Sequence, residues 1–187
     1  MSAIVSNIDV AGFEGEGLDI IGTEDADFLL GTNDSELIDG LGGDDSISAS
    51  DGDDLLFGGQ GNDTIGGGAQ NDSILGGAGA DLIFAYDGDD IVDAGFGNDI
   101  IYSGEGADTL FGGEGQDSFV FDLEDFQNDP SVHTIADFEL GDDSVIILGS
   151  DEDDSFALDS ATGSISVNDE EIIVFEGGDA ADDFELL

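Results

Sequence analysis

The stretch GGQGNDTIG, residues 58–66, holds four glycines, one aspartate and a single large apolar residue, Ile65. Written in nines from Gly22, the same pattern continues without insertion to Val120, which gives eleven consecutive nonads. We number the positions of each nonad from one to nine. One nonad cannot bury its isoleucine alone, whereas stacked copies bury a continuous row of such residues, so the repeat predicts a solenoid.

Three positions of the nonad carry the pattern. Position four is glycine in eight nonads, with Asp25, Asp34 and Gln70 as exceptions, which indicates a positive φ or a backbone approach too close for a Cβ atom. Position eight is always large and apolar: Leu29, Ile38, Ile47, Leu56, Ile65, Ile74, Ile83, Val92, Ile101, Leu110 and Phe119. Position six is always acidic: Asp27, Glu36, Asp45, Asp54, Asp63, Asp72, Asp81, Asp90, Asp99, Asp108 and Asp117.

This alternation predicts a six-residue tight loop followed by a three-residue strand with one inward-pointing side chain. If two nonads make one full turn, the short strands form two parallel sheets, so the expected fold class is all-β. With two nonads per turn, loops eighteen residues apart lie above one another. Their position-six carboxylates then converge.

Stacked carboxylates with backbone carbonyls between them form an anionic, all-oxygen site. Such a site favours calcium, because magnesium keeps its waters and zinc prefers nitrogen or sulfur. The chain has 48 acidic residues, no lysine or arginine and one histidine, so its net charge of -48 opposes folding until cations neutralise it. Folding and metal binding are therefore expected to be coupled.

The same composition restricts the partners. A surface without lysine or arginine cannot neutralise phosphates, which excludes nucleic acid, and no apolar run is long enough for membrane insertion. High charge with abundant glycine is also typical of disordered chains. However, 39% of the residues are apolar and they recur in register, which argues against disorder.

The run from GGQGNDTIG through GGAGADLIF to GGEGQDSFV resembles the RTX (repeats-in-toxin) nonapeptide G-G-x-G-x-D-x-U-x of hemolysin-type calcium-binding proteins. The resemblance implies a parallel β-roll, a right-handed solenoid with two nonads per turn that is closed by a C-terminal β cap. It also implies that calcium is held between loops two nonads apart, in a protein exported by type I secretion machinery. The carboxylate ligands it implies are Asp45, Asp54, Asp63, Asp72, Asp81, Asp90, Asp99, Asp108 and Asp117. The implied carbonyl ligands belong to Gly43, Gly52, Gly59, Gly61, Gly77, Gly79, Gly88, Gly95, Gly97, Gly104, Gly106, Gly113 and Gly115. Counting pairs of better nonads gives about seven Ca²⁺ sites.

Two departures from the repeat weaken particular sites. The first two nonads lack the paired glycines and are expected to form a metal-poor cap. Gln70 stands where glycine is expected, which puts in doubt the sites on either side of Asp72.

We therefore divide the chain into an N-terminal cap segment (1–21), the roll (22–120) and a C-terminal β capping segment (121–187). The tail is similar to the segment that follows such rolls in serralysin-like proteins, with Asp137 and Asp143 as further candidate calcium ligands or as solvated loop carboxylates. The stretch 164–175 predicts a hairpin around Asn168 to Glu171. The final DDFELL resembles a type I secretion signal, and His133 is expected in a loop near Pro130.

Positions seven and nine should point outward, yet many are apolar, which predicts apolar patches that something covers. We expect the tail residues Phe121, Phe126, Phe138, Val145 and Ile147 to pack on one outer face. The N-terminal Ile4, Val5, Ile8, Val10 and Phe13, a protein partner or self-association would cover the other.

Three functions are compatible with these features. The first is a secreted, non-catalytic calcium-binding protein that folds outside the cell. The second, an enzyme, lacks support because the chain has no HExxH, no GxSxG, no cysteine and a single histidine. The third is an interaction protein: an adhesin, a surface module or a calcium-binding module detached from a secreted enzyme.

Overall fold

The computed structural model describes residues 19–128, 131–139, 141–149, 156–159, 164–168 and 170–175, and it is built almost entirely of β-strands. The elements of the roll are β1 (Ile20–Ile21), β2 (Phe28–Leu30), β3 (Leu37–Asp39), β4 (Ser46–Asp51), β5 (Leu55–Gln60), β6 (Thr64–Ala69), β7 (Ser73–Ala78), β8 (Leu82–Asp87), β9 (Ile91–Phe96), β10 (Ile100–Glu105), β11 (Thr109–Glu114) and β12 (Ser118–Asp122). After them come α1 (Leu123–Asn128), β13 (His133–Ile135), β14 (Ser144–Leu148), β15 (Phe156–Asp159), β16 (Ser164–Val167) and β17 (Glu170–Phe175).

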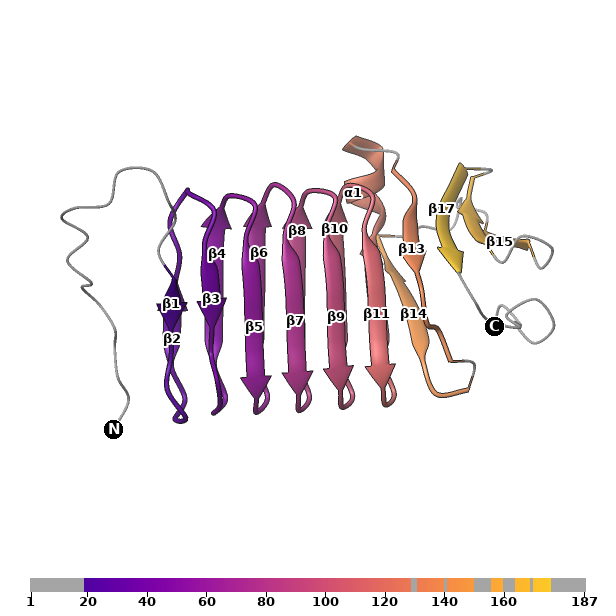
Figure 1. The fold of residues 1–187 in the computed structure, drawn as a ribbon. Helices are drawn as coiled ribbons and strands as arrows, with labels where there is room; N and C mark the ends of the chain where they lie inside the picture. Colours follow the sequence, from indigo (N-terminus) through magenta and orange to yellow (C-terminus); the bar gives the residue numbers. More distant parts are fainter. Residues whose placement is uncertain are drawn as a thin grey trace.

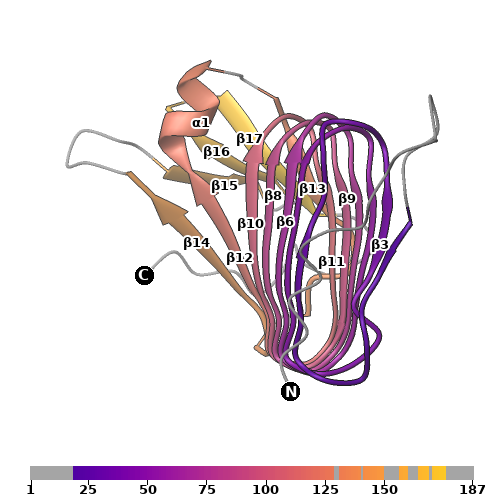
Figure 2. The ribbon, with the colours of Figure 1, turned by 90° about the vertical axis from the view of Figure 1, so that its left-hand side faces the viewer.

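The strands form two parallel sheets that face each other, and successive turns superimpose when the coil is viewed end-on (Figures 1 and 2). The odd sheet has the order β1-β3-β5-β7-β9-β11-β13-β17-β16-β15, and the even sheet has the order β14-β12-β10-β8-β6-β4-β2. Partners in the roll are eighteen residues apart, as with Ile65 and Ile83. The predicted parallel β-roll with two nonads per turn is therefore confirmed.

The core between the sheets uses two positions of each nonad. Every position-eight side chain from Leu29 to Phe119 is at most 2% exposed. From Gly40 onward position one is also buried, and in every nonad it holds glycine, alanine or serine, as at Ala49, Ala85 and Ser103. We did not predict this second core position. Large and small residues alternate along each strand, so the two sheets can pack closely.

The strands are longer than the predicted three residues. From β4 to β11 each strand has six residues, running from position seven to position three of the next nonad. The cause is the conformation at position two, where φ is positive, so the chain bends but still pairs with the next turn: Gly59 faces Gly77. The loop proper shrinks to positions four to six.

The tail begins by extending the roll. The Asp122 carboxylate caps α1 by accepting a hydrogen bond from the Glu124 N–H (3.0 Å), and the helix has acidic residues in its first turn, as the helix dipole favours. After α1, β13 adds to β11 in parallel and β14 adds to β12. β17 then adds to β13 in parallel, and β16 pairs antiparallel with both β15 and β17. β16 and β17 form the predicted hairpin, with Asn168 at positive φ.

The prediction that the tail covers an outer face is wrong. Phe121 is fully buried in the core, and Val145 and Ile147 lie in β14, which continues the even sheet. Phe126 and Phe138 pack against the core instead of against an outer sheet face. The tail closes the end of the roll because its strands carry the parallel ladder onward. The apolar N-terminal residues and the final DDFELL lie outside the described residues.

The outer faces therefore keep exposed apolar side chains. Phe84 and Phe111 are half-buried, whereas Ile91 (53%) and Phe96 (60%) are among the more exposed apolar side chains.

No helix among the described residues is long and apolar enough to span a bilayer.

Substituting the loop glycine Gly61 with alanine tests the close stacking of turns. Gly61 has a φ of 129°, and a Cβ atom there would lie 1.9 Å from the Gly43 carbonyl oxygen. We expect Gly61→Ala to lower the free energy of unfolding of the calcium-loaded protein by about 3 kcal/mol or more, from backbone strain and overpacking together. The measurement is chemical denaturation followed by circular dichroism.

Gly141→Ala is the matched control, because Gly141 has a φ of 94° but no atom within 4 Å of the added Cβ. It should cost only the strain, roughly 1–2 kcal/mol. Equal losses in the two variants would mean that the turns do not approach as closely as described.

Candidate metal centre

The position-six carboxylates form two columns along the edges of the roll. In each column the Oδ1 atom of an aspartate accepts a hydrogen bond from the backbone N–H of the position-six residue eighteen places earlier. Between Asp63 N and Asp81 Oδ1 the distance is 2.8 Å. The even column contains Asp27, Asp45, Asp63, Asp81, Asp99 and Asp117, and the odd column contains Glu36, Asp54, Asp72, Asp90 and Asp108. All nine bonds measure 2.7 to 2.9 Å.

The second oxygen of these carboxylates is buried without a hydrogen-bond donor among the described residues. This holds for the Oδ2 atoms of Asp45, Asp54, Asp63, Asp72, Asp81, Asp90, Asp99 and Asp117. Asp108 Oδ2 is equally buried, but His133 Nδ1 lies 3.0 Å from it. A buried, ionised carboxylate with an unpaired oxygen costs several kcal/mol unless a cation is near it. The columns thus present a regular series of oxygens that lack a positive partner.

Backbone carbonyl oxygens lie beside these orphaned atoms. A Cβ atom built on Gly58 would lie 2.5 Å from both Asp63 Oδ2 and the carbonyl oxygen of Gly76 in the next turn. The same holds one turn earlier, where a Cβ atom on Gly40 would meet Asp45 Oδ2 at 2.4 Å and the Gly58 oxygen at 2.5 Å. Carboxylate and carbonyl oxygens therefore border the same space.

The loop glycines that the resemblance implied as carbonyl ligands share one backbone conformation. All thirteen, from Gly43 to Gly115, have φ between 87° and 148°. At position four, the carbonyl oxygen of one loop points at the glycine of the loop above it. A Cβ atom on Gly79 would lie 1.7 Å from the Gly61 oxygen, and one on Gly97 would lie 1.6 Å from the Gly79 oxygen.

This donor set fits a hard cation with oxygen ligands. Calcium accepts carboxylate and carbonyl oxygens in flexible geometry, whereas zinc prefers nitrogen or sulfur ligands, of which the columns offer a single imidazole at one end, that of His133. No group of three or more acidic or histidine side chains that could hold a metal ion occurs within the described residues. A cation here would therefore bind to paired carboxylates and backbone carbonyls.

Two departures from the repeat behave differently. Gln70 has a φ of 80°, and its carbonyl oxygen points at Gly88 as the glycine carbonyls do at their neighbours, so the backbone at this loop is not disturbed.

In the first two nonads a threonine at position two binds the carboxylate instead. The Thr23 N–H donates to Asp27 Oδ2 (2.6 Å), and Thr32 donates to Glu36 through its N–H (3.1 Å) and its hydroxyl. Both oxygens of Glu36 therefore have donors, which agrees with a metal-poor cap, whereas Asp27 Oδ1 is buried without a hydrogen-bond partner among the described residues.

Side chains of the tail take the next place in each column. Asp143 Oδ1 accepts the Asp117 N–H (3.0 Å), while its Oδ2 accepts the Glu139 N–H (2.8 Å). Asp137 accepts the N–H groups of Gly112 and Gly113, both at 2.9 Å. Both aspartates therefore cap backbone N–H groups of the last turn and are not merely solvated.

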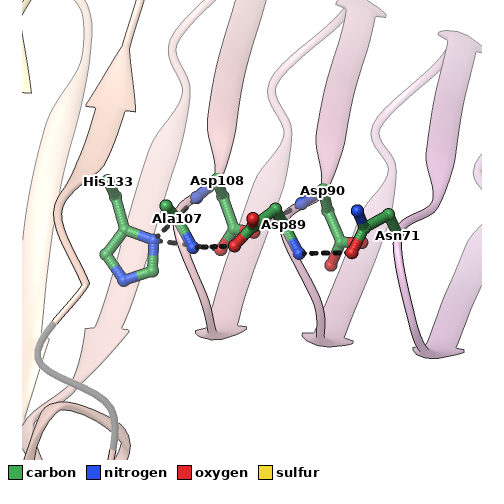
Figure 3. Close-up of polar contacts among 6 residues, drawn as sticks. All are labelled: Asn71, Asp89, Asp90, Ala107, Asp108 and His133. Carbon is green, nitrogen blue, oxygen red and sulfur yellow. Dashed lines mark hydrogen bonds and ion pairs between the residues drawn. The ribbon is translucent and has the colours of Figure 1, made fainter.

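The odd column ends at His133, which is buried at the start of β13 and not in a loop as predicted. Its Nδ1 lies 3.0 Å from Asp108 Oδ2 and 3.4 Å from the Asp108 N (Figure 3). The rings of Phe121 and Phe126 pack against the imidazole, with centroids 5.1 and 5.0 Å away. The sequence did not reveal this role, because His133 is twenty-five residues from Asp108 and outside the repeat.

A second ladder at position five was also missed. Here the side-chain oxygen of one loop accepts the backbone N–H of the next loop, in the opposite direction to position six. Asn71 Oδ1 accepts the Asp89 N–H at 3.0 Å, and Asp89 Oδ1 accepts the Ala107 N–H at 2.9 Å (Figure 3). Frequent Asp and Asn at position five was the available signal.

Burial raises the pKa values of several aspartates in the columns. It raises the pKa of Asp72 to about 7 and of Asp90 to about 8, while the N–H donated from the preceding turn acts against it and neighbouring carboxylates add to it. The pKa values of Asp45, Asp81 and Asp117 are raised to about 6 for the same reason. Without metal, the folded columns hold protons at pH values where free aspartates are ionised.

The calcium-free protein should therefore fold more readily at acidic pH. The folded state binds more protons than the unfolded chain from roughly pH 4 to pH 8, so its stability falls as pH rises through this window. Circular dichroism in EGTA should show β structure near pH 4 to 5 that is lost towards pH 8. With excess Ca²⁺ the β signal should persist at pH 8, and calcium-free β content that increases with pH would contradict the assignment.

The positive φ of Gln70 gives a second prediction. A residue other than glycine in this conformation costs roughly 1–2 kcal/mol, so Gln70→Gly should raise the free energy of unfolding of the calcium-loaded protein by about 1 kcal/mol. Gln116→Gly at position five is the control, since Gln116 does not have a positive φ. A destabilised Gln70→Gly variant would show that the glutamine side chain has a role of its own.

Comparison with known families agrees with this geometry. A family model described as RTX calcium-binding nonapeptide repeat (4 copies) matches residues 30–65, 66–101 and 86–119. A search of curated proteins found no significant match.

Proposed function

Because residues 30–119 belong to the RTX calcium-binding nonapeptide repeat family, we propose that this protein is a secreted, non-catalytic calcium-binding β-roll that folds outside the cell. The observation that carries the proposal is the series of buried aspartate Oδ2 atoms without donors. Bound Ca²⁺ would supply the positive charge that these oxygens lack. Among the described residues, the one imidazole beside such an oxygen is that of His133, 3.0 Å from Asp108 Oδ2 at the end of the odd column.

The number of ions follows from the pairs of consecutive aspartates whose Oδ2 atoms are orphaned. The even column offers the pairs Asp45/Asp63, Asp63/Asp81, Asp81/Asp99 and Asp99/Asp117. The odd column offers Asp54/Asp72, Asp72/Asp90 and Asp90/Asp108, and in the last pair Asp108 Oδ2 also lies 3.0 Å from His133 Nδ1. We therefore propose about seven sites, including the two on either side of Asp72, whose loop backbone is regular despite Gln70.

The location follows from charge and calcium supply. Calcium sites in extracellular modules work at roughly 10⁻⁴ to 10⁻³ M, well above cytosolic concentrations. A chain of charge -48 would remain unfolded inside the cell, which suits passage through type I secretion machinery, and would fold on meeting calcium outside.

The non-catalytic part of the proposal rests on the uniformity of the columns. From Asp45 to Asp117, each aspartate of the columns accepts the same hydrogen bond from the preceding turn, and Asp108 is distinguished by its contact with His133. A general acid and base need two groups in different environments.

A role as an adhesin, a surface module or a module of a secreted enzyme is the second candidate function. The exposed apolar side chains on the outer faces favour it.

The test is a calcium titration followed by circular dichroism at neutral pH, with equilibrium dialysis to count the ions. We expect little β structure in EGTA and a cooperative gain of it on adding Ca²⁺. Asp81→Asn, which alters two adjacent sites, should weaken binding roughly tenfold, because calcium affinity follows the number of charged ligands.

Asp93→Asn is the matched control, since it removes one exposed charge from an outer face and leaves the columns intact. It should leave the calcium midpoint nearly unchanged. Full β structure in EGTA at neutral pH, or equal effects of the two variants, would overturn the proposal.

A further inference from the structure

The outer face of the even sheet carries a hollow that calcium binding does not explain. Phe84 and Tyr102 are register partners on β8 and β10, and their rings stack with centroids 4.8 Å apart and planes inclined by 18°. Tyr86 stacks on Phe84 at 5.8 Å and 23°, and a Cβ atom on Gly66 would lie 3.2 Å from the Tyr86 ring. Three aromatic rings thus stand in a row on this face.

The hollow opens beside this row. Its volume is about 180 Å³, and it is bordered by the three rings together with Gly104, Val120, Asp122, Asp125 and Leu148. Gly104 provides no side chain between Tyr86 on β8 and Asp122 on β12. Asp125 reaches the hollow from α1, which contacts β10 and β12 and is seen beside the even sheet in Figure 2.

The residues that border the hollow include two carboxylates, those of Asp122 and Asp125, and no basic side chain. Burial, followed by the charges of Asp122 and Glu105, raises the pKa of Asp125. One oxygen of Asp122 caps α1, which leaves its second oxygen for another partner. Aromatic rings on one side and carboxylates on the other suit an organic cation, because ring faces attract cations and carboxylates bind them directly.

The shape narrows the choice of cation. A volume of about 180 Å³ is smaller than the clefts of about 300–1,000 Å³ that hold drug-sized ligands, so it suits a single side chain. A guanidinium group is planar, stacks on aromatic rings and binds carboxylates through two parallel hydrogen bonds. Exposed apolar residues continue from the hollow across the same face, with Ile100 at 41%, Ile146 at 42% and Leu148 at 39%, and a polypeptide would cover them where a small molecule would not.

We propose that this hollow binds an arginine side chain of a partner polypeptide, with the guanidinium between the aromatic row and the carboxylates of Asp122 and Asp125. The partner is not a second copy of this chain, since its 187 residues contain neither lysine nor arginine. Tyrosine and arginine are also the residue types that most often dominate binding energy at protein interfaces. The site is separate from the calcium columns and goes beyond the proposed function.

The chain contains its own reporter for the test. It has two tyrosines, Tyr86 and Tyr102, and no tryptophan, so all of its tyrosine emission comes from residues at the hollow. The calcium-loaded protein is titrated with the capped peptide Gly-Leu-Arg-Leu-Gly while this emission is followed. The same peptide is then used with citrulline, which has the same shape without the charge, and with lysine in place of arginine.

We expect saturable binding of the arginine peptide and about tenfold weaker binding of the citrulline peptide, with the lysine peptide in between. Asp125→Asn should weaken arginine-peptide binding about tenfold. Glu114→Gln is the matched control, because it removes one exposed charge from the opposite sheet and should have little effect. Circular dichroism with calcium verifies that both variants are folded.

Four outcomes would overturn the proposal. They are no saturable change in emission, equal affinity for the arginine and citrulline peptides, equal losses in Asp125→Asn and Glu114→Gln, and free arginine amide binding as tightly as the peptide. The third would mean general attraction to a polyanion, and the fourth would assign the hollow to a small molecule.

Discussion

The structure depends on the hydrogen bond from a backbone N–H to the carboxylate one turn later. Each such bond joins two turns, and it places one aspartate oxygen against a donor while leaving the other without one. The bond fixes the side chain, so the orphaned oxygen has a defined position and cannot turn towards water. The same contact that orders the roll therefore also creates its need for cations. Folding and metal binding therefore both depend on this one hydrogen bond.

Most of the roll could be predicted because its information is periodic. The strict position-eight and position-six residues gave the core, the two sheets, the eighteen-residue spacing and the carboxylate columns. The length of the strands could not be predicted, because it depends on the positive φ at position two, where Leu41, Ser50 and Tyr86 adopt the same conformation as glycine. A residue type other than glycine does not reveal such a conformation from sequence.

The ends of the roll were predicted least well, because they break the period. His133 and Asp143 take the next place in the odd and even columns, although neither is eighteen residues from its predecessor. The turns that bring them there include α1, which is set by its own cap at Asp122. Non-periodic contacts of this kind are tertiary, and a single sequence contains no repeated signal for them. The tail consequently closes the roll, while the outer faces, expected to be covered, remain exposed among the described residues.

The two different end groups also limit how the roll can change in length. Consecutive nonads alternate between the odd and even sheets, so inserting or deleting a single nonad would move every later strand to the opposite sheet. The imidazole of His133 and the carboxylate of Asp143 would then exchange columns. Insertion or deletion of eighteen residues avoids this exchange. The unit by which such a chain can grow or shorten is thus a whole turn, although the unit visible in its sequence is half of one.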